Sequence, residues 1–555
     1  MSFLQLVRRE MHGSLPKLLF MSSLGGISNA SILAAINTGI QDSASGHKPS
    51  LWAATLFLVA LFLFMKTQQY VTITATAEIE AIIHKIRLRL MDHIRHSELL
   101  QIEHVGRARI IAVITSDTSV LTQASNMLCF TVQGAVLICF VGLYVAFLSL
   151  PAFILTVAIV TGAGTVFHFK NRRLVAQKAE SAAWERQLFD RLTDFLDGFK
   201  EVRLNRARSD DLFNDSAEVS KTAANIKIRT QGETFKIVVT SQISMYILLG
   251  AVVFIAPNFS NTLAGASISK ATTTLLFVVG ACFGLVQSIP ILANANAAAN
   301  RIDRLETELA AASSEIQLRT VTAPIGFQRI DVRDIVFRYV DKLSDTIFQI
   351  GPIDFTLSRG DLVFITGGNG SGKSTFLRVL AGLYAPSSGE ITLDGVRIGN
   401  ETRDQYRALM SAIFFDYHLF RRLYGISDAE AAEVDRLLGL FRLTNATNFS
   451  KGEFGTLDLS SGQSRRLALV VSLLERRPVL LLDEWTAEQD PEFRRKFYDE
   501  LLPELVQAGA TLVVVTHDER YLQQLNLRAR KVRMDEGRII EQRLTRAADD
   551  ECSRN

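Results

Sequence analysis

Residues 361–376, DLVFITGGNGSGKSTF, decide how the rest of this 555-residue chain is interpreted. Asp361 to Thr366 is a short apolar run, which is typical of a buried strand. The residues that follow match G-x-x-x-x-G-K-[ST], and the run from Thr375 to Leu383 is typical of a helix. In such a loop the backbone N–H groups point inward, and the helix adds the positive end of its dipole. Because a strand precedes the pattern and a helix follows it, the stretch predicts a triphosphate site and not a chance match in a glycine-rich loop.

The residues predicted to cradle the phosphates are Gly367, Gly368, Asn369, Gly370, Ser371, Gly372, Lys373, Ser374 and Thr375. Lys373 is predicted to reach the β- and γ-phosphates. The hydroxyl of Ser374 is predicted to bind Mg²⁺. The expected cofactors are therefore ATP and Mg²⁺.

Composition places two different kinds of domain in one chain. The hydrophobic fraction is 48%, but the long apolar runs all lie before residue 300, and the second half is typical of a soluble α/β domain. The net charge of +3 gives no reason to expect an acidic partner such as nucleic acid. The four cysteines do not have the spacing of metal ligands, so we expect neither a disulfide framework nor a zinc site.

Six apolar runs are predicted to cross a membrane as helices, since each is close to the roughly 20 residues that span about 30 Å of hydrocarbon. They are about 18–40, 51–70, 127–148, 151–169, 235–256 and 271–292. The first follows Arg8, Arg9 and Lys17, as the apolar part of a signal peptide would. It is long and has no clear small-residue cleavage site, so we interpret it as a retained membrane helix.

Polar side chains interrupt the first and fifth runs: Ser22, Ser23, Ser28, Asn29, Ser31, Asn37, Thr240, Ser241, Gln242 and Ser244. One interpretation is that they face the interior of a bundle or a water-filled cavity. The other is that they bond to neighbouring helices or to their own backbone, which is favoured for any single residue.

The charges of the connecting segments orient these helices. Residues 66–126 contain seven Lys and Arg and residues 169–234 contain thirteen, whereas 41–50, 149–150 and 257–269 contain Lys48 alone. Basic residues stay on the cytoplasmic side. Both termini and the two long segments are therefore predicted to be cytoplasmic.

The two long segments have the pattern of helices that continue into the cytoplasm. We expect each pair to be joined by a short crossing helix, near Glu98–Ala108 and near Asp194–Arg206. A solvated helical hairpin without a partner is the alternative. Contact with the ATP-binding domain is favoured, because an ATPase in the same chain has to act on something.

The second half contains further residues suited to ATP chemistry. A strand at 330–337 leads to Tyr339, an aromatic side chain that is a candidate for stacking on adenine. A second anion-binding helix N-terminus is predicted directly before the helical run SRRLALVVSLLERR. Its residues are Ser460, Ser461, Gly462 and Gln463.

Two carboxylates follow the buried run 479–482, and a histidine follows the apolar run 511–516. Asp483 is predicted to hold Mg²⁺ through water, and Glu484 to polarise the attacking water. His517 is predicted to contact the γ-phosphate. Acids after a strand are often only a solvated loop, but their place downstream of Lys373 favours the catalytic interpretation.

In order and spacing these motifs resemble the ABC transporter family. GGNGSGKS resembles Walker A, LSSGQ the signature, LLLDE Walker B, AEQD the D-loop with Asp490, Tyr339 the adenine-stacking residue and His517 the switch histidine. The resemblance implies that ATP lies between Walker A of one subunit and the signature of another. It therefore implies a second copy of this chain, with two composite ATP sites and both sites active.

A narrower resemblance concerns the cargo. Residues 411–420, the LDLSSGQSRRLAL segment and residues 483–505 resemble the bacterial exporters of cyclic peptides and siderophores, including lariat-peptide, syringomycin-type and pyoverdine-type exporters. This implies a multi-pass protein of a bacterial inner membrane and a peptide or siderophore substrate.

The chain departs from the family pattern at three places. Phe415 and Asp416 stand where a glutamine is usual, so Asp416 is a candidate Mg²⁺ ligand in its place. Ser461 replaces a glycine of the signature, and a small residue still suits the turn. The D-loop reads Ala487-Glu488-Gln489-Asp490 and keeps Asp490.

The predicted fold is a membrane α-helical bundle of six transmembrane helices, of exporter type, fused to an α/β P-loop ATPase domain. The predicted boundaries are 1–311 for the membrane domain, 312–328 for a linker, 329–545 for the ATPase domain and 546–555 for a polar tail. The predicted function is ATP-driven export of a cyclic or modified peptide or a peptide siderophore by a homodimer in the lipid bilayer. A lipid flippase or multidrug exporter, an ATP-gated regulator without transport, and an ATP-binding module on a membrane anchor remain alternatives.

Overall fold

The computed structural model describes residues 3–11, 15–44, 48, 50–148, 150–255, 265–312, 326–340, 347–426, 430–525 and 527–545. The chain forms two compact units, which are Met1–Asp92 with Arg107–Glu308, and His93–Gly106 with Leu309–Asn555. The sequence boundaries placed His93–Gly106 in the membrane domain, whereas this segment packs with the second unit. Most of the predicted linker and all of the predicted polar tail fall outside the described residues.

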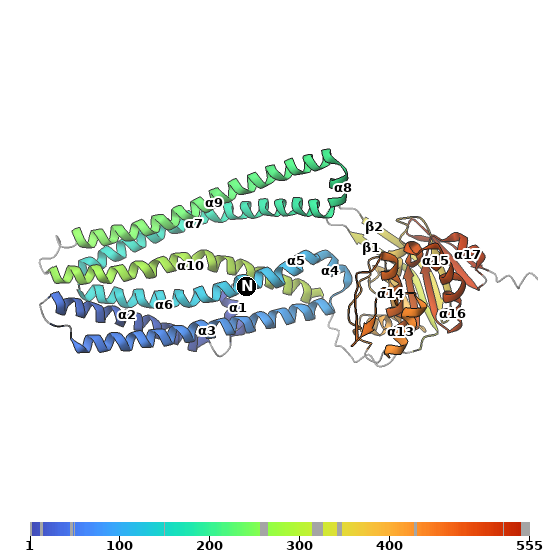
Figure 1. Cartoon of the computed structure of the whole chain (residues 1–555), viewed down its shortest axis with the longest axis horizontal. Coiled ribbons are helices and arrows are strands. Elements are labelled where there is room, and N and C mark those ends of the chain that lie inside the picture. Colours follow the sequence, from blue (N-terminus) through green and yellow to red (C-terminus); the bar gives the residue numbers. More distant parts are fainter. Residues whose placement is uncertain are drawn as a thin grey trace, which may run out of the picture. The chain divides into compact units, whose positions relative to one another are not determined.

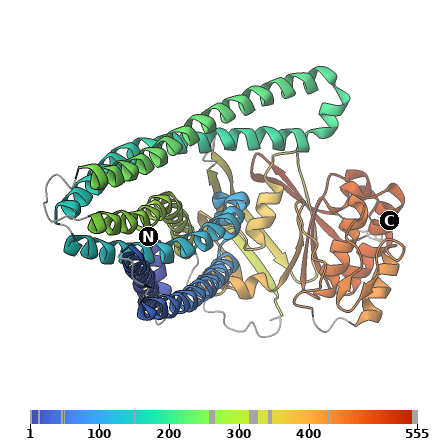
Figure 2. The same cartoon turned by 60° about the vertical axis from the view of Figure 1, so that its left-hand side comes forward.

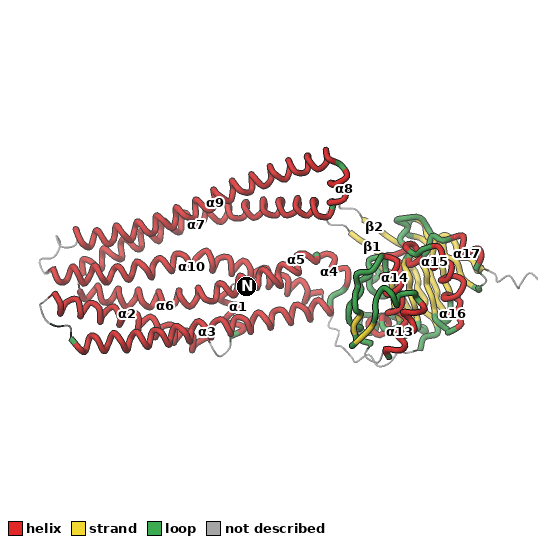
Figure 3. Tube along the Cα trace, in the orientation of Figure 1, coloured by secondary structure: helices red, strands yellow, loops and turns green. Residues whose placement is uncertain are grey.

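The described secondary structure of the first unit is helical (Figures 1 and 3). Its helices are α1 (Phe3–Glu10), α2 (Leu15–Ala44), α3 (Leu51–His96), α5 (Arg107–Ala112), the π-helical turn η1 (Val113–Asp117), α6 (Thr118–Leu148), α7 (Leu150–Asp197), α8 (Phe199–Leu204), α9 (Arg206–Phe254) and α10 (Gly265–Ala312). Among these, α2, α3, α6, α7, α9 and α10 have 30 residues or more. Each contains one of the six apolar runs singled out in the sequence.

Four stretches of the described residues are long and apolar enough to cross a membrane: Leu15–Ser43, Leu51–His96, Arg107–Phe147 and Arg206–Ala251. They overlap the predicted spans of α2, α3, α6 and α9. The spans predicted in α7 and α10 stay predictions, as does the total of six. The four stretches make the chain a multi-pass membrane protein.

The polar residues of the membrane helices mostly bond to their own backbone. Hydroxyl groups of Ser23, Ser28 and Ser31 donate to the carbonyl four residues earlier, at 2.7–3.0 Å. Asn37 instead donates across to Thr274 of α10 at 2.9 Å, and both side chains are buried. For these residues the structure agrees with the interpretation that polar groups in the spans satisfy one another and the backbone.

Short helices occupy both places where crossing helices were predicted, α4 (Leu99–Val105) and α8. In Figure 2, α7 and α9 run side by side as a long hairpin that α8 closes. Phe199 and Leu204 at the ends of α8 are 60% and 88% exposed. The segment that contains α4 belongs to the second unit and is described with it below.

The second unit is built on two sheets and a small hairpin. A four-stranded antiparallel sheet has the order β2-β1-β4-β5, from β1 (Arg329–Val340), β2 (Ile347–Ser358), β4 (Ser388–Leu393) and β5 (Val396–Arg397). A six-stranded sheet has the order β12-β11-β3-β10-β9-β6, from β3 (Leu362–Thr366), β6 (Met410–Ile413), β9 (Val479–Asp483), β10 (Thr511–Val515), β11 (Ala529–Asp535) and β12 (Arg538–Thr545). Strands β7 (Phe449–Ser450) and β8 (Glu453–Phe454) form the hairpin.

Helices flank the six-stranded sheet (Figure 3). They are α11 (Lys373–Leu380), α12 (Arg403–Arg407), α13 (Ala431–Leu440), α14 (Ser461–Leu474), η3 (Trp485–Glu488), α15 (Pro491–Lys496), η4 (Phe497–Leu501), α16 (Leu502–Gln507) and α17 (Glu519–Gln524). Helix cover explains why β3, β9 and β10 are buried along their whole length and consist largely of aliphatic residues.

The parallel register brings three strand ends to one edge of the sheet. Val515 of β10 pairs with Ile365 of β3 on one side and with Asp483 of β9 on the other. The phosphate loop, the two acids and the histidine follow these three strands directly. Ligand sites of open parallel sheets lie at this carboxyl edge.

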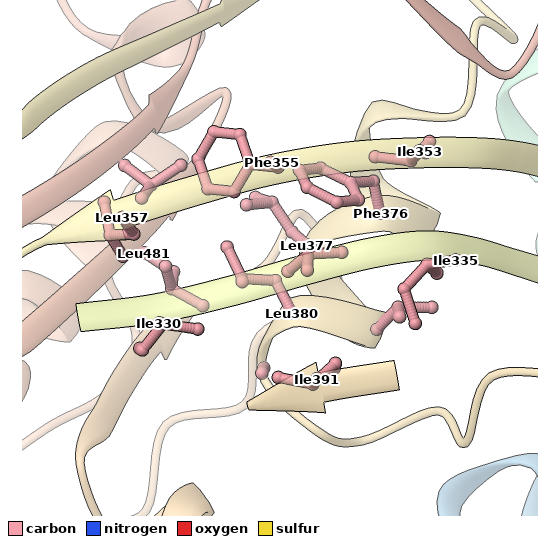
Figure 4. Packing of buried hydrophobic residues seen from close by; sticks show 14 of the residues in the cluster. Ile330, Ile335, Ile353, Phe355, Leu357, Phe376, Leu377, Leu380, Ile391 and Leu481 are labelled. Atoms are coloured by element: carbon pink, nitrogen blue, oxygen red, sulfur yellow. The ribbon is translucent and has the colours of Figure 1, made fainter. Parts of the chain in front are cut away.

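The core below this edge is shown in Figure 4, where Phe376 and Leu377 of α11 pack between strands of both sheets. Phe376 is 0% exposed and meets the ring of Phe355 edge-on at 5.4 Å. We expect Phe376→Ala to cost the ATPase unit about 3–5 kcal/mol of unfolding free energy, because it leaves a cavity under the phosphate loop.

Urea-dependent proteolysis of the full-length chain in detergent, read on peptides of the ATPase unit, measures this loss. Phe420→Ala is the control, since Phe420 is 61% exposed and its loss is expected to change stability by less than about 0.5 kcal/mol. Equal resistance of the two variants would contradict the packing argument.

Candidate functional site

The phosphate loop needs glycine at positions where no other residue fits. Gly367, Gly370 and Gly372 have φ of +152°, +78° and +94°. A Cβ on Gly367 would lie 2.2 Å from the carbonyl oxygen of Met534, so the loop packs directly against β11. The glycines therefore serve backbone geometry, as expected of a loop that turns its N–H groups inward.

Inside the loop, Lys373 is the first residue of α11 and is 5% exposed. Its Nζ donates to the carbonyl oxygens of Gly367 at 3.1 Å and Gly368 at 2.9 Å. Burial lowers the pKa of Lys373, and the charges of Glu484 and Asp483 oppose that shift. The ammonium group thus lies within the loop that is predicted to hold the phosphates.

Asp483 ends β9 and is 2% exposed. Burial raises its pKa, while a hydrogen bond from Ser374 counteracts the rise. Within the described part of the chain, Asp483 Oδ1 and the hydroxyl of Ser371 are buried without a hydrogen-bond partner. Asp483 Oδ1 suits a hydrated cation as its missing partner, and the Ser371 hydroxyl suits a phosphate oxygen.

A Mg²⁺ ion fits this donor set. Among the described residues no group of three or more His, Cys, Asp or Glu side chains gathers as a metal site. Mg²⁺ is commonly held by one or two protein ligands together with water and substrate phosphates. Ser374 and Asp483 would supply those protein ligands, and the ion would neutralise charge on the phosphates.

Glu484 has a left-handed backbone, with φ of 48° and ψ of 35°. Its N–H donates to the carbonyl of Val515 at 3.1 Å, and its Oε1 lies 3.1 Å from Nε2 of His517. A non-glycine residue in this conformation costs free energy and is often found at functional sites. The structure therefore brings the predicted water-activating acid and the predicted switch histidine into contact.

Helix α14 starts with a complete capping box. The hydroxyl of Ser460 accepts from the N–H of Gln463 at 3.3 Å, and the side chain of Gln463 accepts from the N–H of Ser460 at 3.0 Å. A Cβ on Gly462 would meet the carbonyl of Glu488 at 2.9 Å. Ser461 is exposed in the first turn, where a small residue fits.

Two arginines that the sequence reasoning passed over connect this turn to the acids. Arg465 is 2% exposed, donates to the carbonyl of Glu484 and pairs with Glu488 at 3.2 Å. Arg466 donates to Gln489 at 2.8 Å and pairs with Asp490. The only sequence signal was the pair of arginines directly after LSSGQS.

Asp490, predicted to lie at the nucleotide, caps α15 by accepting from the N–H of Phe493 at 2.8 Å. This bond, followed by the neighbouring charge of Arg466, lowers the pKa of Asp490. Asp490 therefore shapes the turn between η3 and α15. Its predicted contact with nucleotide stays a prediction.

Two further predicted residues lie beside side chains that the sequence reasoning did not link to them. Tyr339 is half-buried at the end of β1, with its ring centroid 6.0 Å from that of His104. Asp416 accepts from Arg378 through both carboxylate oxygens, each at 3.1 Å. Adenine stacking by Tyr339 and Mg²⁺ binding by Asp416 stay predictions.

Comparison with known proteins identifies the family of the chain. Residues 350–487 match the family described as ABC transporter. The chain is 30% identical over 557 residues, covering 96% of each protein, to the ATP-binding protein SyrD of Pseudomonas syringae pv. syringae. It is 32% identical to the probable syringafactin export ATP-binding/permease protein SyfD of Pseudomonas syringae pv. syringae (strain B728a), over 39% of this chain and 34% of that one.

The fold is similar to the solved structure of a bacterial Atm1-family ABC exporter with ATP bound. The TM-score is 0.75 at 19% identity, with 99% of this chain and 97% of that chain covered. The similarity to SyrD extends over nearly the whole chain and includes both units. With its nucleotide-binding edge and its long apolar helices, the chain belongs to the ABC transporter family, as an exporter-type half-transporter that couples ATP hydrolysis to transport.

Proposed function

We propose that this chain forms a homodimer that exports a cyclic or modified peptide, or a peptide siderophore, across a bacterial inner membrane. The ATPase units and the termini lie on the cytoplasmic side. The observation that carries the proposal is the contact of Glu484 with His517 at the edge that holds the phosphate loop, in a chain that also has long apolar helices. This sheet edge carries residues suited to ATP hydrolysis. It therefore favours a transporter that hydrolyses ATP over a gate that only has to bind ATP.

We assign the following roles to the residues of this edge. The N–H groups of the loop from Gly367 to Gly372 and the ammonium of Lys373 hold the phosphates. Ser374 and Asp483 would hold Mg²⁺, which when bound would offset phosphate charge. Glu484 orients and polarises the attacking water, and His517 keeps the Glu484 carboxylate in place and contacts the γ-phosphate.

The second copy completes each site in this proposal. One chain has one phosphate loop and one capped Ser460-Ser461-Gly462 turn. The family resemblance implies that these two elements pair between two chains. The N–H groups at the start of α14 in one copy would cover the ATP held by the other. Closure on ATP and release after hydrolysis would then alternate two states of the membrane helices, because the states differ in affinity for ATP.

The cargo rests on the relatives. SyfD carries syringafactin export in its name, and the sequence resembles exporters of cyclic peptides and siderophores. We expect purified chain in inverted proteoliposomes to accumulate one member of a panel of labelled cyclic peptides, lipopeptides and siderophores when ATP is added outside. The same member is expected to stimulate ATP hydrolysis.

The control in this assay is the Glu484→Gln variant, which should bind ATP and accumulate nothing. ATP-dependent movement of labelled lipid, with no response to any peptide, would replace the peptide proposal by a flippase. Hydrolysis without movement of either class would contradict export.

A further inference from the structure

Arg378 on α11 is in contact with two other segments of the ATPase unit. It lies five residues after Lys373, and its side chain is 23% exposed. One guanidinium nitrogen donates to the hydroxyl of Tyr384 at 3.2 Å, and another donates to both carboxylate oxygens of Asp416 at 3.1 Å. The guanidinium also lies 5.8 Å from the ring centroid of Phe414. A planar group held on two sides has little freedom to rotate, so Arg378 fixes the relation between these segments.

Tyr384 passes this contact on to α4. Its ring is 4% exposed and stacks on Phe337 at 4.9 Å. Its hydroxyl accepts from Arg378 and donates to the carboxylate of Glu103, at 2.9 Å to the nearer oxygen. Burial, together with the neighbouring Glu103, raises the pKa of Tyr384 to about 12, so the hydroxyl keeps its proton near neutral pH.

The segment that contains α4 is attached to the ATPase unit at its other end as well. Glu98, directly before α4, pairs with Arg403 at 3.2 Å and with Arg407 at 2.6 Å. Leu99 and Leu100 pack against the core that contains Phe376. Helix α3, which contains a predicted membrane span, ends at His96, two residues before Glu98. A displacement of α4 therefore has a direct covalent route into α3.

Arg378 and the phosphate-loop residue Lys373 lie on the same short helix, α11, which runs from Lys373 to Leu380. Asp416, the other partner of Arg378, stands where the family resemblance places a glutamine. Contacts thus run from α11, which begins at Lys373, through Arg378 and Tyr384 to Glu103.

We propose that Arg378 is the positioning residue that connects the ATP site to α4, and that the Arg378–Asp416 pair and the Tyr384–Glu103 hydrogen bond together replace the missing glutamine. The inference rests on the proposed function and names the residues that transmit the state of the site. Binding of phosphates at the start of α11 changes the charge near the Arg378 guanidinium. This guanidinium contacts Asp416 and Tyr384. Binding of MgATP can displace α4 only to the extent that the free energy of these contacts differs between the ATP-bound and the ATP-free state.

Hydrogen exchange of residues 93–106 tests the connection without relying on turnover. The full-length chain in nanodiscs carries Glu484→Gln in every sample, and exchange is compared with and without MgATP. We expect MgATP to change the exchange of α4 amides in this parent. Tyr384→Phe removes only the hydroxyl and with it one hydrogen bond to the charged Glu103. We expect the loss of this bond to make the α4 amides exchange about tenfold faster.

In both Tyr384→Phe and Arg378→Met the MgATP-dependent change is expected to disappear, while the affinity for MgATP by titration calorimetry stays within about threefold of the parent. Arg378→Lys keeps the charge but not the two-sided contact, so it should restore part of the response. Arg436→Met is the matched control, since Arg436 makes a similar bidentate pair with Glu433, at 2.8 and 2.9 Å, away from this network. Its response to MgATP should equal that of the parent.

An α4 response in Tyr384→Phe and Arg378→Met equal to that of the parent would overturn the inference. Should Arg378→Met fail to fold, Tyr384→Phe decides alone, since the Tyr384 ring keeps its packing on Phe337. A parent that binds MgATP without any α4 response would overturn the inference and leave the proposed function standing. A parent that does not bind MgATP would overturn both.

Discussion

Glu484→Gln is expected to lower ATP turnover by about 10²–10⁴-fold, which is the usual contribution of a positioned general base. Gln keeps the shape of the side chain and an oxygen for His517, but it loses the charge that polarises water. Because Glu484 follows a buried strand and donates its N–H to Val515, the left-handed backbone should persist. Steady-state phosphate release by the chain in nanodiscs, together with MgATP affinity, measures the effect.

The matched control is Glu519→Gln. Glu519 lies two residues after His517, but its carboxylate is 63% exposed and pairs with Lys531 on the surface. Turnover of this variant is expected to stay within about twofold of wild type, as is usual for exposed ion pairs. Equal turnover of Glu484→Gln and wild type would remove Glu484 from the catalytic role.

Lys373→Met is expected to reduce ATP binding and turnover by about two orders of magnitude, because it removes a buried ammonium donor aimed into the phosphate loop. Met fills a similar volume, so the loop keeps its packing. Thermal unfolding should show a folded ATPase unit, which separates loss of ligand contact from loss of fold. Lys531→Met serves as the control and should bind ATP normally, because the partly exposed Lys531 pairs with Glu519.

Mixed dimers extend this prediction to the composite site. When one copy carries Lys373→Met and the other carries Ser461→Arg, one of the two sites keeps both wild-type elements, and part of the turnover should remain. When both changes lie in the same copy and its partner is wild type, both sites are damaged, and turnover should fall to the level of Lys373→Met. Equal turnover of the two arrangements would contradict a site shared between copies.

The strands that carry the site residues at the carboxyl edge of the six-stranded sheet could be predicted from the local pattern of aliphatic residues. The aliphatic runs before Gly367, Glu484 and His517 are β3, β9 and β10, each buried throughout. These strands are parallel neighbours, and parallel strands place their carboxyl ends at one edge of a sheet. The pairing brings Glu484 into contact with His517, which the sequence reasoning had treated one residue at a time.

Other features carried no local signal. The sequence reasoning assigned no role to Arg465 and Arg466, yet Arg465 is buried and donates to the carbonyl of Glu484. Asp416 was considered as a replacement for a Mg²⁺-binding glutamine, and its pairing with Arg378, 38 residues away, depends on how β6 and α11 pack. Sequence periodicity describes one element at a time and does not report which elements face each other.

The sequence by itself determined the two kinds of domain, the apolar runs and the phosphate loop, because these depend on composition, hydrophobic period and the special backbone of glycine. The tertiary structure alone decided that His93–Gly106 packs with the ATPase unit and that Glu103 meets Tyr384, 281 residues later. Contacts over such separations arise when apolar faces are buried together and polar groups at their margins find partners. That choice is made by the packing of the whole unit and leaves no pattern in any single stretch of chain.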